Sequence, residues 1–162
     1  PTRRSSDLGK DPLAGVRFQD SIEQKAFVMG GGDFSAPAQN VVDFLAKKTS
    51  TELPRTSYPQ GVKPGDLWQL FPVEIAEGLA EAILFFERKM PGFAGPGGVL
   101  IAPETRTTSP IRFVRDSSMQ SSSLPGLMPI GEGAGYAGGI ASAALEGFRA
   151  AQAEAHRYLI EN

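Results

Sequence analysis

The residues that most clearly could form a binding site are five glycines within the nine residues Gly131–Gly139. A short apolar run, residues 127–130, precedes them and predicts a buried strand. From Ile140 onward, small and apolar residues recur at the spacing of a helix. The predicted order is therefore strand, glycine turn and helix N-terminus. Such a turn aims unpaired backbone N–H groups and the positive end of a helix dipole at one point, where nucleotide cofactors and other anionic groups bind.

The glycine run contains one literal G-x-G-x-x-G, at Gly133, Gly135 and Gly138, which is weak by itself in a chain with 19 glycines. The dinucleotide fingerprint also requires a second strand and an acidic residue about 20 residues further on. The sequence ends at Asn162, so we do not expect this run to be the first βαβ unit of a dinucleotide-binding domain. The alternative is a turn whose glycines only let a helix pack closely on a sheet. Taken alone, the motif slightly favours this packing interpretation.

A second stretch that could bind a ligand carries Arg106, Arg112 and Arg115 among several threonines and serines. Ile111 and Phe113 alternate with Arg112, which predicts a short strand. An arginine here could clamp a substrate carboxylate or contact a cofactor. The alternative is a surface strand with arginines in ordinary salt bridges, and composition alone favours it. The sequence does not decide which arginine faces a site.

The run from Leu127 to Ala150 resembles the C-terminal flavin-contacting segment of FAD-dependent oxidoreductases with two dinucleotide-binding domains. It is most similar to the bacterial group of uncharacterised FAD-dependent dehydrogenases. Upstream motifs of that group occur in the same order, at residues 23–27, 31–34, 36–39, 57–58, 61–62 and 104–112. The resemblance covers residues 12 to 158, and several ordered motifs are far more specific than one glycine pattern.

The resemblance implies FAD as the cofactor. It places the flavin contacts at Gly131, Glu132, Gly133, Ala134, Gly135, Tyr136, Ala137, Gly138, Gly139 and Ile140. Glu132 would accept a hydrogen bond from a ribityl hydroxyl, at a position where many relatives carry aspartate. The following helix would point its N–H groups at the pyrimidine edge of the isoalloxazine ring. A weaker implication assigns contacts with substrate or cofactor to Arg106, Ser109 and Arg112.

The leading hypothesis for function is therefore an FAD-dependent oxidoreductase or dehydrogenase acting on a small-molecule substrate. The flavin would carry the hydride, and no residue stands out as a catalytic acid or base. Use of NAD(P)H is compatible with the resemblance, but no residue of this chain indicates it. Two alternatives stay open: a nucleotide- or phosphate-binding module, and a non-catalytic helical interaction domain.

The expected fold class is α/β, as the C-terminal part of a Rossmann-like FAD-binding domain preceded by a helix-rich cap or substrate segment. Residues 1–8 are expected to be a non-native tail, residues 9–96 the cap or substrate segment, and residues 97–162 the return to the FAD-binding domain. Members of the resembling group begin with a strand–GxGxxG–helix unit for the ADP half of FAD. No such unit lies upstream of Gly131, so we expect the N-terminal remainder of the same polypeptide as a partner.

Local patterns predict the elements of the first hundred residues. A helix is expected from Asp20 to Met29, a second one opening at Ser35 and Pro37, and a third after Pro72. Residues 49–66 predict an extended connector, and residues 97–102 a strand.

Composition limits the classes of function. The formal net charge of −2 indicates neither nucleic acid nor an anionic membrane as a partner. The absence of cysteine excludes disulfides and thiolate chemistry, and the single histidine, His156, argues against a histidine metal site. No apolar stretch approaches the roughly 20 residues of a membrane span, and no signal peptide is evident. We therefore expect a cytoplasmic protein without a metal.

Overall fold

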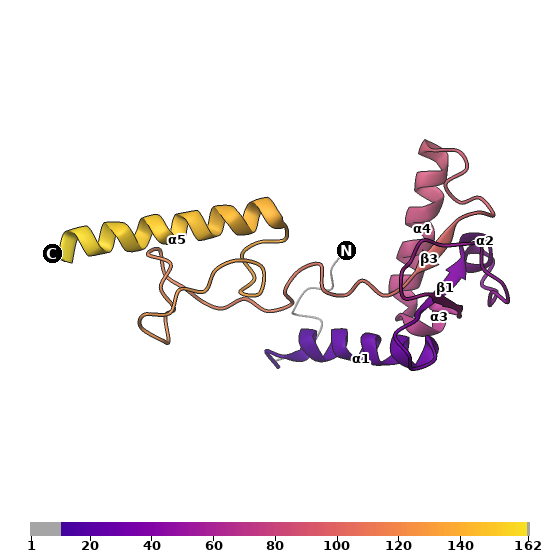
Figure 1. Cartoon of the computed structure of the whole chain (residues 1–162), viewed down its shortest axis with the longest axis horizontal. Helices are drawn as coiled ribbons and strands as arrows, with labels where there is room; N and C mark the ends of the chain where they lie inside the picture. Colours follow the sequence, from indigo (N-terminus) through magenta and orange to yellow (C-terminus); the bar gives the residue numbers. More distant parts are fainter. Residues whose placement is uncertain (1–10, 162) are drawn as a thin grey trace. The chain divides into compact units, whose positions relative to one another are not determined.

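Helices and short strands are interspersed along the chain in the computed structural model, which describes residues 11–161. The elements are α1 (Ala14–Met29), β1 (Ala36–Asn40), α2 (Val41–Leu45), β2 (Val62–Pro64), α3 (Leu67–Leu70), α4 (Val73–Lys89), β3 (Val99–Ile101) and α5 (Ile140–Glu161) (Figure 1). The predicted α/β class is confirmed at this level.

The described chain divides into two compact units. Residues 20–104 form one, here called the sheet unit, and residues 11–19 with 105–161 form the other, here called the loop unit. Because β3 pairs with β1, it belongs to the sheet unit. The assignment of residues 9–96 to a cap and of residues 97–162 to an FAD-binding domain stays a prediction. The predicted tail, residues 1–8, lies outside the described residues.

The sheet of the sheet unit has three strands in the order β2-β1-β3. β1 pairs in parallel with β2, with Ala36 opposite Val62, and antiparallel with β3, with Ala38 opposite Ile101. The prediction of a helix opening at Ser35 and Pro37 is wrong, because this stretch is the buried central strand.

The helix starts later because Asn40 supplies the N-cap. Its side-chain Oδ1 accepts a hydrogen bond from the Val42 N–H at 2.9 Å, so α2 begins directly after β1. Pro37 by itself favours the first turn of a helix over a central strand, because proline lacks the N–H that a central strand donates. Pairing with two neighbouring strands decided between these alternatives, and that pairing is tertiary information.

The core of the sheet unit is built around Phe44, which is fully buried. The Trp68 ring stacks on it at 5.2 Å, and the Trp68 indole N–H donates to the Phe44 carbonyl at 2.8 Å. Gln39 is also fully buried and is satisfied on both ends. Its amide nitrogen donates to the Lys48 carbonyl at 2.7 Å, and its oxygen accepts from the Leu67 N–H at 2.8 Å.

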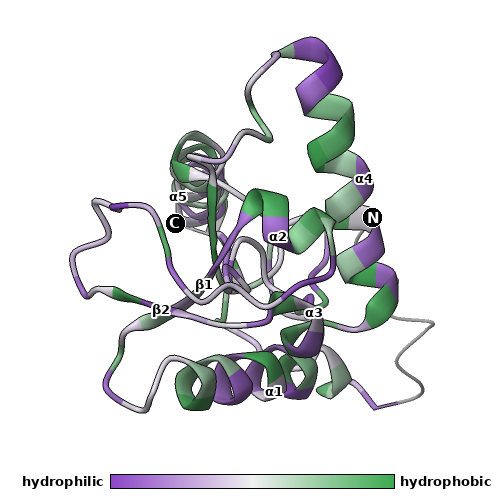
Figure 2. Ribbon diagram, turned by 90° about the vertical axis from the view of Figure 1, so that its right-hand side faces the viewer, coloured by the Kyte–Doolittle hydropathy of each residue, from purple (hydrophilic) through white to green (hydrophobic). Residues whose placement is uncertain are grey.

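Other elements agree with the sequence to differing degrees. α4 follows Pro72 and β3 lies within residues 97–102, as predicted. Polar and apolar bands alternate along α4 (Figure 2). The first helix begins at Ala14, six residues before the predicted cap at Asp20. The predicted connector contains β2, and α3 was not predicted.

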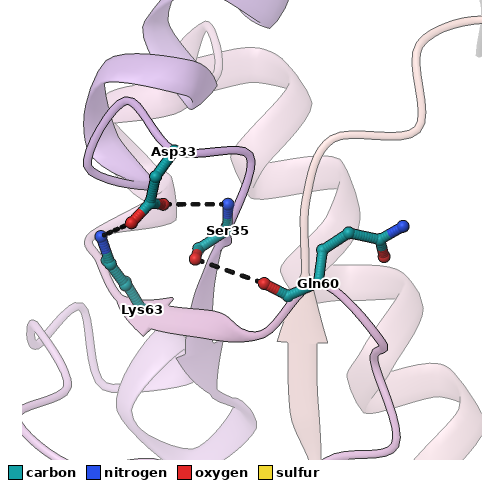
Figure 3. Close-up of polar contacts among 4 residues, drawn as sticks. All are labelled: Asp33, Ser35, Gln60 and Lys63. Carbon is teal, nitrogen blue, oxygen red and sulfur yellow. Dashed lines mark hydrogen bonds and ion pairs between the residues drawn. The ribbon is translucent and has the colours of Figure 1, made fainter.

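The loop between α1 and β1 is closed onto β2 by polar contacts (Figure 3). The Asp33 carboxylate accepts from the Lys63 ammonium at 2.8 Å and from the Ser35 N–H at 3.2 Å. The Ser35 hydroxyl donates to the Gln60 carbonyl at 3.4 Å. Gly31 lies beneath this contact at φ +90°, where a Cβ would stand 2.2 Å from the Lys63 nitrogen. The hydrogen bond from Lys63, followed by those from Ser35, lowers the pKa of Asp33 from 3.8 to about 2.

The Asp33 carboxyl should titrate near pH 2 in a side-chain NMR titration of the folded protein. A depressed pKa means that the contact is fully formed above pH 3.8 and is lost as the pH falls through about 2. Lys63→Met removes the largest cause of the shift, so the midpoint should rise toward the ordinary value. An unchanged midpoint in Lys63→Met would contradict this account of the loop.

Candidate functional site

The glycine run and the arginine-bearing segment lie against each other in the loop unit. The Ser109 hydroxyl donates to the Gly133 carbonyl at 3.2 Å, and the Phe113 N–H donates to the Ala134 carbonyl at 3.2 Å. The Tyr136 hydroxyl then donates back to the Phe113 carbonyl at 2.7 Å. The structure therefore brings together the two stretches that the sequence singled out separately.

The predicted strand over residues 127–130 is wrong, because these residues have no regular structure. The Leu127 carbonyl accepts from the Ser121 N–H at 2.7 Å, and the Pro129 carbonyl accepts from the Arg115 guanidinium at 2.8 Å. The Leu127 and Pro129 carbonyls, which a β-ladder would use, thus accept from a backbone N–H of another loop residue and from an arginine side chain. An apolar run of four residues cannot reveal this, since so short a run does not establish a strand, and Leu127 and Ile130 are exposed.

The short strand predicted around Arg112 is also absent. The only regular pairing of this stretch in the described chain is a single antiparallel bridge between Arg115 and Ser121. Pro110 interrupts the segment just before it, and the side chains of Ser109 and Tyr136 take up neighbouring backbone carbonyls. Side-chain hydrogen bonds replace the expected ladder.

The glycine turn and the helix after it are present as predicted. The Gly135 N–H donates to the Glu132 carbonyl at 2.8 Å, and the Tyr136 N–H donates to the Gly131 carbonyl at 3.0 Å. Gly131 and Gly135 have φ angles of +75° and +82°, which glycine adopts without a Cβ penalty. α5 then begins at Ile140, so its unpaired N–H groups adjoin the glycine run.

The glycines of the run differ in what surrounds them. A Cβ on Gly135 would lie 2.4 Å from the Ile111 carbonyl oxygen and 3.0 Å from the Arg112 Cα, so the packing of the loop itself requires glycine there. A Cβ on Gly133 would meet no atom of residues 11–161 within 4 Å, and its φ is not positive. Neither packing nor backbone angle explains glycine at this position. The loop therefore has a packed side at Gly135 and an open edge at Gly133.

Arg115 and Glu146 form an ion pair that the sequence did not reveal. Their side-chain N–O distance is 2.8 Å, and only 12% and 9% of the two side chains are exposed. The guanidinium carbon of Arg115 also lies 3.5 Å from the centroid of the Tyr136 ring. The pair joins α5 to the loop.

The apolar stripe expected on α5 is not its buried face in the described chain. Ile140 and Phe148 are 94% and 61% exposed, whereas Glu146 and Ala150 are buried. The ion pair with Arg115 explains this orientation, since a buried carboxylate is tolerated only beside a partner.

The remaining predicted site residues are more open. Glu132 is exposed, and within residues 11–161 its carboxylate has no hydrogen-bond or ion-pair partner. Gly138, Gly139 and Arg106 are exposed, and Ala137 is half-buried. Among the described residues, no cluster of acidic or histidine side chains could hold a metal ion, and no helix is long and apolar enough to cross a membrane.

Comparison with known proteins agrees with the resemblance. The family model "FAD-dependent protein, C-terminal domain-like" matches residues 2–107, and the chain therefore belongs to this family. An "Uncharacterized protein" of Clostridium beijerinckii (strain ATCC 51743 / NCIMB 8052) is 42% identical over 146 residues. That match covers 89% of this chain but 27% of the relative, so the chain spans about a quarter of the relative's length. An aligned stretch of this size includes the glycine run wherever it begins, whereas the family match ends before it.

Gly135→Ala should loosen the loop, because it adds a Cβ against the Ile111 carbonyl at a left-handed backbone position. The strained φ alone costs roughly 1–2 kcal/mol. Hydrogen exchange of the Tyr136 and Phe113 amides should accelerate accordingly. Gly133→Ala is the matched control, since its Cβ meets no neighbour, and exchange should stay unchanged. Equal effects of both substitutions would refute the division into a packed side and an open edge.

Proposed function

We propose that this chain is the C-terminal part of an FAD-dependent oxidoreductase, and that its glycine run contacts the ribityl chain and isoalloxazine ring of the flavin. Membership of a family of FAD-dependent proteins supports the cofactor. The bound flavin would supply the hydride-transfer chemistry, while the residues of this chain bind and orient it. A small molecule would be the substrate, and NAD(P)H is a candidate electron donor.

The observation that carries the proposal is the open edge of the loop at Gly133. Glycine at this position is unexplained by the protein's own contacts, but close approach of a ligand to the backbone would require it. The N-terminus of α5 follows directly, and its positive end favours negative charge by roughly 0.3–1 kcal/mol. Reduction of a flavin places negative charge on the pyrimidine edge of the ring, so this helix would raise the reduction potential.

Individual residues would take distinct roles. Glu132 would accept a hydrogen bond from a ribityl hydroxyl, and its carboxylate is unpartnered within residues 11–161. Ser109 would support the loop, because its hydroxyl donates to the Gly133 carbonyl. Arg106 and Arg112 would contact substrate or cofactor from the neighbouring segment.

The N-terminal remainder of the same polypeptide would complete the site as a Rossmann-like FAD-binding domain. The relative is much longer than the aligned stretch, which supports this arrangement. Exposed apolar side chains on α5 support it too, since Ile140, Phe148 and Leu159 are each more than half exposed. Such faces on a soluble unit mark contacts with further structure.

The polypeptide that contains this chain together with its remainder should bind FAD, visible as flavin absorbance after purification. In that polypeptide, Gly133→Val should weaken FAD binding at least about tenfold, which corresponds to 1.4 kcal/mol. A β-branched side chain would fill the open edge, while the fold should be retained because no atom of the part of the chain that the structure describes lies within 4 Å of the added Cβ. A wild-type polypeptide that neither contains nor takes up FAD would overturn the proposed function.

The same FAD titration tests the role of Glu132. Glu132→Ala should weaken binding by about 1–3 kcal/mol, the usual cost of leaving a charged hydrogen bond unmade. Glu132→Gln keeps an acceptor oxygen and should weaken it less. If Glu132→Ala binds FAD as tightly as the wild type, Glu132 is not the ribityl contact.

The 162-residue chain expressed alone should bind FAD poorly or not at all. The ADP half of the cofactor would have no pocket, and the apolar face of α5 would stay uncovered. Equilibrium dialysis against FAD, with the longer polypeptide as the control, measures the difference. Stoichiometric FAD on the isolated chain would show that the remainder is not needed.

A further inference from the structure

Two arginines lie on one tyrosine ring in the loop unit, and their surroundings differ. The guanidinium carbon of Arg115 is 3.5 Å from the Tyr136 centroid, and that of Arg112 is 4.4 Å away. The Tyr136 hydroxyl donates to the Phe113 carbonyl, which fixes the ring against the segment between the arginines. Cation–π contact therefore holds both guanidiniums beside the glycine run.

Both terminal nitrogens of the Arg115 guanidinium contact groups of the protein itself. One terminal nitrogen pairs with the Glu146 carboxylate at 2.8 Å, and the other donates to the Pro129 carbonyl at 2.8 Å. The side chain is 12% exposed, and its positive charge is balanced by an equally buried negative one. Little of this guanidinium is available to a ligand.

Arg112 has the opposite character. Its backbone packs closely on Gly135, where a Cβ would lie 3.0 Å from the Arg112 Cα, and this contact fixes its position on the loop. Its side chain is exposed, and within residues 11–161 it has neither a hydrogen bond nor a carboxylate partner; its contact is the Tyr136 ring. Within the described residues, Glu132 of the glycine turn makes no ion pair with it. Arg112 is therefore a positioned guanidinium whose donors and charge are unused.

We propose that Arg112 is the arginine of this segment that binds an oxyanion of the ligand, and that Arg115 is a positioning residue that holds the loop beneath it. The proposal rests on the proposed flavin site. A guanidinium binds carboxylate or phosphate through two parallel hydrogen bonds, and prior fixation of its side chain lowers the entropy lost on binding. A substrate carboxylate and a cofactor phosphate share this chemistry.

The first experiment needs no FAD. Arginine Nε–H signals of the longer polypeptide are followed by NMR during titrations with acetate and with inorganic phosphate. The Arg112 signal should shift with saturation, while those of Arg115 and of Arg157, which pairs with Glu154 on α5, should not. A static Arg112 signal, or equal shifts at all three arginines, would overturn the assignment. Failure here is distinct from failure of FAD binding.

Glu146→Gln tests the positioning role of Arg115. This variant keeps the side-chain volume and removes the charge that balances Arg115. The Arg115 signal should then begin to respond to acetate and phosphate, a change that loss of packing alone would not produce. An Arg115 signal that stays silent in the folded variant would show that Glu146 does not set its availability.

The FAD-loaded polypeptide distinguishes the sources of the oxyanion. If Arg112 binds a cofactor phosphate, Arg112→Gln should weaken FAD at least about tenfold and leave riboflavin, which lacks phosphate, unchanged. If it binds a substrate carboxylate, acetate should perturb the flavin spectrum of the wild type, and Arg112→Gln should keep its FAD affinity but lose this response to acetate. Arg112→Lys should recover part of either effect because it restores the charge. Arg112→Gln with unchanged FAD affinity and an unchanged acetate response would reject both sources.

Discussion

The ion pair between Arg115 and Glu146 is the interaction on which the loop unit depends. A carboxylate that is about nine-tenths buried is stable only beside a positive partner, so Glu146 can face the loop only while Arg115 stays in place. The other buried residues of this unit's helix and loop include the small Ala134 and Ala150. Small side chains bury little apolar area. Directional polar contacts must therefore fix the geometry of this unit.

Arg115 also fixes the open edge of the loop at Gly133. Its guanidinium also binds the Pro129 carbonyl, two residues before the glycine turn, and packs on Tyr136 just after the turn. The turn is thus held at both ends, while Glu146 anchors α5 to the same group. One side chain sets where the open edge at Gly133 stands relative to the helix N-terminus. The sheet unit is ordered differently, by the apolar core around Phe44.

The sequence predicted the elements whose signals are local. Pro72 marked the start of α4, and the glycine run marked the turn before α5. It failed where tertiary pairing decides, since Pro37 favours a helix start and is disfavoured in a central strand, yet lies in one. Glu146 was missed because its partner, Arg115, lies 31 positions away and no local pattern connects them. The contact between the arginine segment and the glycine run depends on irregular hydrogen bonds, which no periodicity records.

Family membership and the proposed flavin contact rest on different parts of the chain. The family match covers residues 2–107, which include the whole sheet unit, and the glycine run lies beyond it. The similarity to the longer relative spans both, so the two units occur together in that protein as well. Under the proposed function, the flavin would cover the open edge at Gly133, and the remaining polypeptide would cover the exposed apolar side chains of α5. Any ligand that binds only the ordered loop stabilises the ordered state by mass action. Ordering of the glycine run and binding of a ligand to it are therefore thermodynamically linked.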